Sequence, residues 1–400
     1  MKEGWEYKTL GEVGSFKRGG NFSKKDFVKD GFPCIHYGQI HTKFGIFTEK
    51  HLSCVPANIV KKERCAKKGD LVIAITSEDE EGSCKCTAWM ADYEAYVGGH
   101  TAIYSHTLNP LFMSYYFKSP IFQIEKLNYT HGFKVVEISP KDIAKIKIPI
   151  PSLEEQRRIV SYLDSSFKLI DEIKNKALKS LTEAKALFQS ALAEAMEPKE
   201  EWEEKTLGEC CDKINGLWKG KKPPFIYVGV IRNANFTKKM TLDFSNIEYL
   251  DVEVKQYNSR KLKRGDLIIE KSGGSEKQPV GRAVLFLKGD GEYSFSNFTS
   301  VLRIKNNEEL NYYFLYYFLL YIYQRGDTKT MQKATTGIHN IEFEKYLNIK
   351  IPIMSLNEQR RIVSYLDKLS SKVRAIEEKY QKMVEECDAL KQAMLRDVFE

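Results

Sequence analysis

The segment Ile148–Asp164 reads IPIPSLEEQRRIVSYLD, and the segment Ile351–Asp367 reads IPIMSLNEQRRIVSYLD. The two segments differ at only two of seventeen positions and lie 203 residues apart. An internal repeat of this kind indicates that the chain contains two copies of one structural unit. The 400 residues therefore divide into two units of roughly 200 residues, each long enough for a domain with its own core.

Weaker similarities surround this segment in the same order in both copies. The first copy opens with WEYKTLGE from Trp5, and the second opens with WEEKTLGE from Trp202. Three more pairs of segments correspond: Tyr37–Ile40 with Val228–Ile231, Lys67–Ile73 with Lys263–Ile269, and Tyr115–Phe117 with Tyr316–Phe318. The chain is therefore predicted to be a tandem duplication that has diverged most outside the nearly identical segment.

Each copy begins with short apolar runs separated by glycines, a pattern typical of β-strands and turns. The predicted strands include Cys34–Ile40, Asp70–Thr76, Tyr96–Tyr104, Phe225–Ile231, Leu267–Glu270 and Arg282–Leu287. One helix rich in Phe and Tyr is expected in each copy, near residues 110–127 and 308–325. The fold class is therefore α+β, with mixed globular domains at residues 1–151 and 198–354.

A long helix is predicted after each globular domain. Ser152 and Ser355 each begin an S-x-x-E capping box, and no proline or glycine follows before Pro198 or the last residue. The predicted helices span residues 152–197 and 355–400, about 65 Å each at 1.5 Å per residue.

Apolar residues in both helices recur in steps of four and three, which predicts a coiled coil. We expect an antiparallel pair within the chain, with one globular domain at each end; a parallel or intermolecular coiled coil is the alternative. The predicted seam, which also extends through Leu187 and Leu390, contains Ile159, Leu163, Ile170, Ile173, Ile362, Leu366, Leu369, Val373 and Ile376.

Motifs for catalysis are missing from the sequence. It has no G-x-x-x-x-G-K-[ST] phosphate loop, no G-x-G-x-x-G, no Asn-Pro-Pro-aromatic tetrapeptide and no H-E-x-x-H. Cys84 and Cys86, with Cys54 and Cys65, are a weak candidate for a metal site, because zinc-binding pairs are normally separated by two to four residues. We therefore predict a non-catalytic chain without a metal or cofactor of its own. The low cysteine density and the missing signal segment predict a cytoplasmic protein.

The positive charge is concentrated in the globular domains. The net charge is +8, of which residues 1–150 carry +4 and residues 201–350 carry +5, while residues 151–200 carry −1 and residues 351–400 carry 0. Lys and Arg neutralise DNA phosphates, and Arg, Asn and Gln hydrogen-bond to base edges. The candidate DNA-binding residues of the first copy are Lys17, Arg18, Asn21, Lys24, Lys25, Gln39 and His41. Those of the second copy are Lys219, Lys221, Lys222, Arg232, Asn233, Asn235, Gln332 and Lys333, with residues 232–235 matched to residues 39–43.

The repeated pattern I-P-[I/L]-P-x-L-x-E-Q-x-x-I-V-x-x-L-D resembles the specificity subunits of Type I restriction–modification systems. The opening at Trp5 and Trp202 and the Gly-Asp pairs at Gly69 and Gly265 also resemble this family, so the resemblance covers essentially the whole chain. It implies two target-recognition domains, each reading one half of a bipartite site in double-stranded DNA.

The resemblance also implies what the chain binds besides DNA. The long helices are expected to set the spacing between half-sites and to dock modification (methyltransferase) subunits, which restriction (ATP-dependent endonuclease) subunits join. S-adenosylmethionine, ATP and Mg are expected only on these partners. The recognition subunit of a Type IIB-like enzyme is the nearest alternative, and a coiled-coil scaffold without a nucleic-acid role is a more distant one.

Overall fold

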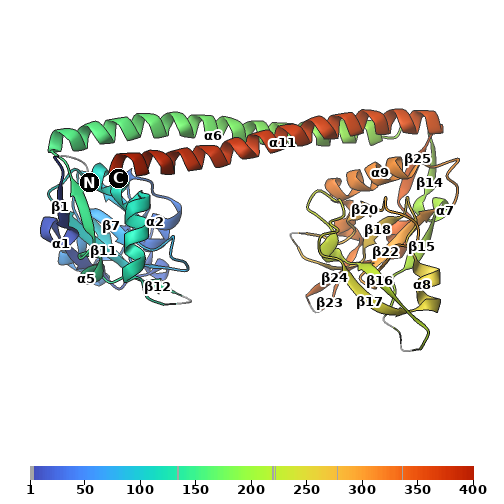
Figure 1. Ribbon diagram of the computed structural model, residues 1–400, viewed down its shortest axis with the longest axis horizontal. Helices are drawn as coiled ribbons and strands as arrows, with labels where there is room; N and C mark the ends of the chain where they lie inside the picture. The colour runs from blue at the N-terminus through green and yellow to red at the C-terminus, as the bar shows by residue number, and fades with distance from the viewer. Residues whose placement is uncertain (1–3, 133–134, 219, 221, 277, 336) are drawn as a thin grey trace. The chain divides into compact units, whose positions relative to one another are not determined.

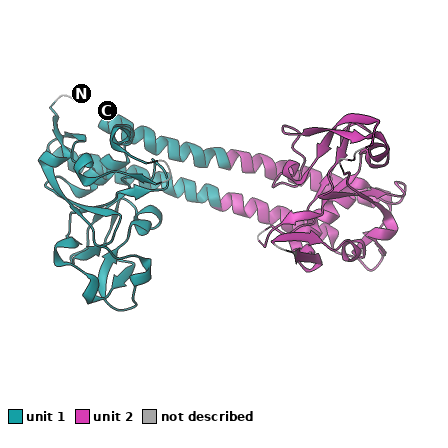
Figure 2. Ribbon diagram, turned by 90° about the horizontal axis from the view of Figure 1, so that it is seen from below, with its two compact units in different colours: residues 1–178, 381–400 teal, residues 179–380 magenta. Residues whose placement is uncertain are grey.

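The computed structural model describes residues 4–132, 135–218, 220, 222–276, 278–335 and 337–400, which form two compact units (Figures 1 and 2). Unit 1 contains residues 1–178 and 381–400, and unit 2 contains residues 179–380. Each unit therefore holds one globular domain and a part of both long helices, α6 (Leu153–Met196) and α11 (Leu356–Phe399). The observed helix ends lie within one residue of the predicted ends.

The globular domain of unit 1 contains two main sheets. The first has the order β2 (Gly14–Arg18), β11 (Thr101–His106), β7 (Leu71–Ala74), β9 (Cys86–Trp89) and β4 (Phe47–Thr48). The second has the order β5 (Ser53–Val55), β3 (Phe32–Ile35), β10 (Ala95–Val97) and β6 (Cys65–Ala66). Side chains of β7 alternate between two cores, because Leu71 packs with the aromatic helix α3 (Pro110–Lys118) and Val72 packs toward the second sheet.

Unit 2 repeats this arrangement. Its main sheet has the order β15 (Cys211–Asn215), β22 (Thr299–Ile304), β18 (Leu267–Glu270) and β20 (Ala283–Leu285). The second sheet contains β17 (Glu248–Glu253), β16 (Phe225–Ile231) and β21 (Tyr293–Phe295), and a third contains β19 (Ser272–Gly274), β24 (Ile338–Ile341) and β23 (Gln332–Thr335). Aromatic residues of α9 (Tyr312–Arg325) pack into its core, as predicted for a helix buried on a sheet.

Short elements complete both domains, and several predicted elements are divided in the structure. The predicted helix near residues 110–127 is divided into α3 and α4 at Pro120, and the predicted strand Asp70–Thr76 is divided into β7 and β8. The predicted strand Cys34–Ile40 ends at Ile35, where the helix α2 (Tyr37–Thr42) follows, and Tyr96–Tyr104 is divided into β10 and β11 by a glycine turn. The other short elements are α1 (Leu10–Val13), β8 (Thr76–Ser77), α4 (Pro120–Glu125), β12 (Val136–Glu137), α5 (Pro140–Ile143), α7 (Leu207–Cys210), α8 (Val254–Arg260) and α10 (Phe343–Leu347).

The two most recognisable sequence motifs of each copy are hydrogen-bonded to each other. In unit 1 the opening motif forms β1 (Glu6–Thr9), which pairs antiparallel with β13 (Lys147–Ile150). In unit 2, β14 (Glu203–Thr206) pairs in the same way with β25 (Lys350–Ile353). The beginning and the end of each globular domain therefore meet at the base of its long helix.

A buried glutamine joins each long helix to its domain. Gln156 is 1% exposed; its Oε1 accepts from the backbone N of Asn109 (2.9 Å), and its Nε2 donates to the carbonyl of Pro151 (2.9 Å). Asn109 is the N-cap of α3. Gln359 makes the equivalent bonds in unit 2, to the backbone N of Asn311 (2.8 Å) and the carbonyl of Met354 (2.9 Å). One amide side chain thus provides a hydrogen-bond partner for a carbonyl just before the long helix and for a backbone N–H at the start of the aromatic helix.

A tyrosine–aspartate hydrogen bond adds a second link between each long helix and its aromatic helix. Tyr115 Oη donates to Asp164 (2.6 Å), and Tyr317 Oη donates to Asp367 (2.5 Å). The sequence comparison paired Tyr115 with Tyr316, and these contacts correct that match by one residue. A run of consecutive tyrosines has no internal landmark, so only the contact to the helix determines the register.

The long helices run antiparallel within unit 1. Lys174 pairs with Asp388 (2.6 Å), and Asp171 pairs with Lys391 (2.5 Å), so residue numbers rise along one helix as they fall along the other. The end of α11 reaches the core of the domain, where the ring of Phe399 lies 5.3 Å from that of Phe112. The C-terminal turn of the second copy therefore contributes to the core of the first domain (Figure 1).

The observed seam differs from the predicted seam at two positions in each helix. Ile173 and Ile376 are 41% and 38% exposed, and Leu187 and Leu390 are 57% and 51% exposed. The next residue along each helix is less exposed, including Lys174, which pairs across to the other helix. The remaining predicted seam residues follow the expected pattern, since Ile159, Leu163, Ile170, Ile362, Leu366 and Val373 are buried and Leu369 is partly buried.

We predict that Gln156→Ala destabilises unit 1 by about 2–4 kcal/mol, because a buried amide and a buried carbonyl each lose their partner. Denaturant unfolding of the full chain measures this loss, and hydrogen exchange should show faster exchange at the start of α3. Arg158→Ala is the control, because Arg158 is highly exposed and its ion pair with Glu155 contributes about 1 kcal/mol or less. Equal effects of the two variants would contradict the role assigned to Gln156.

Candidate nucleic-acid interface

Several strand ends of unit 1 meet at one edge. The parallel strands β3 and β10 end at Ile35 and Val97, and Gly98 N donates to the carbonyl of Ile35 (2.9 Å). The chain leaving β2 joins them, since Gly19 N donates to the carbonyl of Thr101 (2.9 Å). We call residues 17–25, 36–41, 76–77 and 98–100 the strand-end edge of unit 1.

Most predicted DNA-binding residues of the first copy are exposed on this edge. Lys17 and Arg18 end strand β2, and Arg18 pairs with Glu137 (3.1 Å). Lys24 and Lys25 form the short 3-10 helix η1 (Lys24–Asp26), and the exposed Asn21 precedes it. The edge therefore presents four cations, of which one, Arg18, forms an exposed ion pair with another described residue, and such pairs exchange readily with phosphates.

Gln39 and His41 lie on the same edge but on α2, where their polar atoms already have partners. Gln39 is 9% exposed; its Oε1 accepts from the backbone N of His36 (3.0 Å), and its Nε2 donates to Ser53 Oγ (2.7 Å). His41 Nε2 lies 3.3 Å from the carbonyl of Thr76, and burial lowers the pKa of its imidazole. Gln39 thus stabilises the turn after β3, and its role in DNA reading stays a prediction.

The same edge exists in unit 2. The parallel strands β16 and β21 end at Ile231 and Phe295, and Ser296 N donates to the carbonyl of Ile231 (2.9 Å). We call residues 232–235, 271–274, 296–298, 332–335 and 337–340 the strand-end edge of unit 2. Ile231 is therefore the counterpart of Ile35. The sequence comparison had matched Ile231 to Ile40, which lies five residues further along the chain.

This register makes Arg232–Asn235 the counterpart of His36–Gln39. In both turns the fourth side chain accepts from the backbone N of the first residue: Asn235 Oδ1 accepts from Arg232 N at 2.9 Å. Asn235 is 2% exposed, and its Nδ2 also donates to the carbonyl of Asn246 (2.9 Å). The earlier match to residues 39–43 was wrong because it followed a Gly-x-Ile similarity instead of this capping pattern.

Four other predicted residues of the second copy come together on this edge. Arg232 pairs with Glu248, and Asn233 donates to the carbonyl of Ser272 on β19. On β23, Gln332 accepts from Val280 N (3.3 Å), and Lys333 pairs with Glu342 (3.2 Å). Lys222 lies away from them, at the start of β16, where its backbone N donates to Glu253 (2.7 Å). Lys219 and Lys221 lie outside the described residues.

Sequence reasoning missed two polar residues of β24. Asn340 accepts from Ser272 Oγ (2.5 Å), and it lies opposite Lys333 in the pairing of β23 with β24. The neighbouring His339 has a buried Nδ1 without a hydrogen-bond partner among the described atoms. The sequence ATTGIHNI has few strong strand formers at its start, so it gave little sign of a strand edge there.

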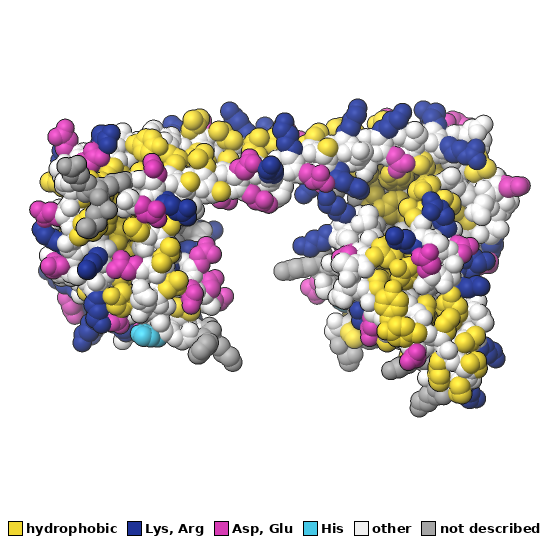
Figure 3. Space-filling view, viewed as in Figure 1, with side chains coloured by type: hydrophobic (Ala, Val, Ile, Leu, Met, Phe, Trp, Pro, Cys, Tyr) yellow, Lys and Arg dark blue, Asp and Glu magenta, His cyan; other side chains and the backbone are white. Residues whose placement is uncertain are grey.

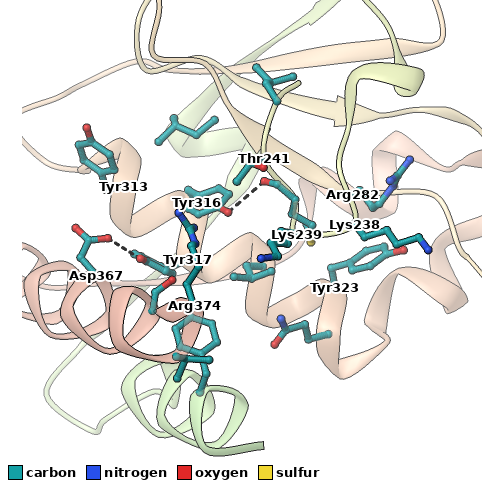
Figure 4. A pocket seen from close by; sticks show the side chains of 18 of the residues that line it. Lys238, Lys239, Thr241, Arg282, Tyr313, Tyr316, Tyr317, Tyr323, Asp367 and Arg374 are labelled. Carbon is teal, nitrogen blue, oxygen red and sulfur yellow. Dashed lines mark hydrogen bonds between the residues drawn. The ribbon is translucent and has the colours of Figure 1, made fainter. Parts of the chain in front are cut away.

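A cavity of about 1110 Å³ lies within unit 2, between α9 and the unit's parts of the long helices (Figures 3 and 4). Tyr316 and Tyr317 project into it, and burial raises the pKa of Tyr316 to about 12, so this hydroxyl stays protonated and donates to the carbonyl of Met240 (3.2 Å). Lys239 pairs with Glu377 (3.5 Å), and Arg374 points toward the tyrosines. The cavity thus combines an aromatic wall with cations.

The thiols and carboxylates show no arrangement for metal binding among the described residues. Cys84 and Cys86 are buried in the core, and burial raises the pKa of both thiols to about 12. In unit 2, Glu270 is buried in an ion pair with Arg282 (2.7 Å), and Asp266 pairs with Arg303 (2.7 Å). No helix in the described part of the chain is long and apolar enough to cross a membrane.

Comparison with known proteins identifies the family. The sequence pattern of the Type I restriction modification DNA specificity domain matches residues 2–183 and 199–386, so the chain belongs to this family. The specificity subunit of the Type I restriction enzyme StySPI from Salmonella potsdam is 23% identical, with 100% of this chain and 89% of that protein aligned. The EcoKI specificity subunit from Escherichia coli K12 is 24% identical with the same coverage.

Solved structures share the fold. A chain from a structure that describes the assembly and conformational transition of the type I R-M system superposes with a TM-score of 0.76 at 21% identity, covering 100% of this chain and 98% of that one. The HsdS subunit from Thermoanaerobacter tengcongensis gives 0.58 at 20% identity, covering 100% and 97%. The α+β tandem architecture predicted from the repeat is confirmed.

We predict that Asn235→Ala lowers the stability of unit 2 by about 1–3 kcal/mol, because its buried bonds to the turn and to residue 246 are lost. Arg232→Ala is the matched comparison: its ion pair is about 40% exposed (37% and 43%), and we expect a loss below about 1 kcal/mol. Thermal or denaturant unfolding distinguishes the two. An Arg232 variant less stable than the Asn235 variant would contradict this assignment.

Proposed function

We propose that this chain is the DNA-recognition subunit of a Type I restriction–modification complex, each globular domain reading one half of a bipartite target. The observation that carries the proposal is the presence of two equivalent strand-end edges, one in each copy of a DNA specificity domain, with exposed cations beside polar side chains. Cations hold phosphates, and polar groups on a rigid edge discriminate bases.

The chain contributes recognition and no catalysis under this proposal. The buried carboxylates of Asp266 and Glu270 are used in ion pairs, and the sequence carries no motif for a methyl donor or for ATP. S-adenosylmethionine, ATP and Mg therefore belong to the modification and restriction subunits, which act in the cytoplasm where the DNA is. The names of the relatives, specificity subunits of Type I enzymes, support this proposal over a Type IIB-like enzyme.

The long helices offer a docking surface for the modification subunits. Ile173 and Leu390 are exposed in unit 1, and Leu187 and Ile376 are exposed in unit 2. In the antiparallel register of Lys174 with Asp388, residue 173 lies opposite residue 389, so Ile173 and Leu390 are neighbours across the pair. Each immediately precedes a seam residue, which places both on the same side of the pair. Figure 3 shows apolar side chains exposed along these helices.

The same pair of positions occurs in both copies. Adding 203 to Ile173 gives Ile376, and adding 203 to Leu187 gives Leu390, so each unit presents one isoleucine and one leucine. Tyr162 and Tyr365, 49% and 52% exposed, extend this match. Apolar residues at helical spacing that the seam leaves exposed are suited to partner helices. Two equivalent patches predict two copies of one partner.

We predict that removing seven residues from each helix, 176–182 and 380–386, shortens the gap between half-sites by about three base pairs. Seven residues span about 10 Å, and base pairs are stacked about 3.4 Å apart. Mapping of methylated bases in cells that co-express the modification subunits measures the gap. The unaltered chain should give a two-part motif with a fixed gap; a continuous motif would contradict the proposal, and an unchanged gap would contradict the spacer role alone.

We predict that Ile173→Glu and Ile376→Glu each weaken the binding of one modification subunit. The introduced carboxylate would be buried in the apolar contact between the helices and that subunit. Light scattering of the assembled complex should show one copy lost per variant, and the double variant should lose both. Lys382→Glu is the control, since Lys382 is highly exposed and lies on the side of α11 away from the seam. Full assembly of the double variant would exclude this surface.

A further inference from the structure

The turn that follows the parallel strand pair has the same construction in both units. In unit 1 it is Gly98-Gly99-His100-Thr101, and in unit 2 it is Ser296-Asn297-Phe298-Thr299. The fourth residue of each, Thr101 or Thr299, donates its hydroxyl to the carbonyl of the first residue. The first residue of each donates its backbone N to the end of the neighbouring strand, at Ile35 or Ile231.

His100 and Phe298 therefore occupy equivalent positions. The carbonyl of His100 accepts from Ile75 N (3.0 Å), just before β8, and the carbonyl of Phe298 accepts from Lys271 N (2.9 Å), just before β19. Each residue thus has its backbone fixed to the strand end of the main sheet. Both side chains are nevertheless exposed, that of Phe298 by 51%. Each unit consequently presents one aromatic ring from a rigid turn in the middle of its strand-end edge.

The backbone of His100 adopts a strained conformation. Its φ is 62°, in the left-handed region that residues other than glycine seldom adopt, although the two preceding residues are glycines. The imidazole lies 5.4 Å from the ring of Tyr37, nearly edge to face. Backbone strain of about 1–3 kcal/mol persists where surrounding contacts enforce it, and such positions are common at binding sites.

The difference between the two rings suits two different half-sites. An imidazole can donate to or accept from a base edge, whereas a phenyl ring offers apolar contact of the kind that recognises the methyl group of thymine. A lysine lies near each turn: Lys24 and His100 both lie close to His36 in unit 1, and the backbone N of Lys271 donates to the carbonyl of Phe298 in unit 2. Phosphate contacts from such cations would bring each ring to the bases.

We propose that His100 and Phe298 are specificity-determining residues, each contacting a base within the half-site read by its own domain. This inference rests on the proposed function, because it assigns a contact within the DNA interface of each unit. It goes beyond that proposal in placing base discrimination on one turn per domain. The buried capping residues Gln39 and Asn235 stabilise the neighbouring turns of each edge by hydrogen bonds to the backbone.

The test uses the full chain assembled with its modification subunits and a duplex library randomised at both half-sites. His100→Ala should relax one base position in the first domain's half-site by roughly 5- to 100-fold, the usual cost of one lost base contact. Phe298→Ala should do the same only in the second half-site. The half-site of the unaltered domain serves as an internal control for folding and assembly.

Matched variants separate base reading from general surface effects. Tyr7→Ala and Tyr227→Ala remove side chains that are 39% and 69% exposed and lie away from the edges, on β1 and near the start of β16, and should leave both half-sites unchanged. His100→Phe retains a ring without hydrogen-bonding atoms, so the preferred base should change instead of relaxing.

Three results would overturn the inference: an unchanged motif in both alanine variants, equal relaxation of both half-sites by either one, or uniformly weaker binding without a change of base preference. The last result would place the rings on the sugar–phosphate backbone. A bipartite motif from the unaltered chain keeps the proposed function in each of these cases. Absence of that motif would overturn the function and the inference together.

Discussion

The buried amide of Gln156, repeated at Gln359, is the interaction on which each unit depends. A carboxamide carries a donor and an acceptor, so it can bond the carbonyl before the long helix and the amide that begins the aromatic helix at the same time. A carboxylate at this position would leave the buried carbonyl without a partner, and an apolar residue would leave both groups without one. This side chain and the tyrosine–aspartate hydrogen bond together set the direction in which the long helix leaves its own domain.

The sequence predicted the architecture correctly, but it did not predict which residues of the two copies correspond on the strand-end edges. Repetition, capping boxes and proline positions predicted both long helices to within one residue. Residue type alone did not separate Gln39 and Asn235 from exposed polar residues, because amides that cap a turn and amides that read bases look alike in a sequence. The shared spacing of three residues, from His36 to Gln39 and from Arg232 to Asn235, was the available signal.

The helix seam shows a different limit. The apolar pattern of four and three allows the helix to face its partner in two slightly different rotations. Either of two adjacent residues can then lie at the seam, as with Ile173 and Lys174. The structure turns Lys174 toward the other helix, where it pairs with Asp388, and leaves Ile173 exposed. A two-helix pair that used all of its apolar residues would have hidden Ile173 and Ile376. Their exposure at equivalent positions indicates that the helices were selected for more than their own pairing, which a single sequence cannot reveal.

The two copies divide their residues by role. Those that join helix to domain, such as Gln156 with Gln359 and Asp164 with Asp367, are identical and make equivalent contacts. On the strand-end edges the backbone hydrogen bonds are the same, but the side chains differ, as at His100 and Phe298. Because the turns are held by backbone and capping bonds, an exposed side chain there can change without disturbing the core. A constant frame with variable exposed positions is what a protein needs to read two different half-sites with one fold.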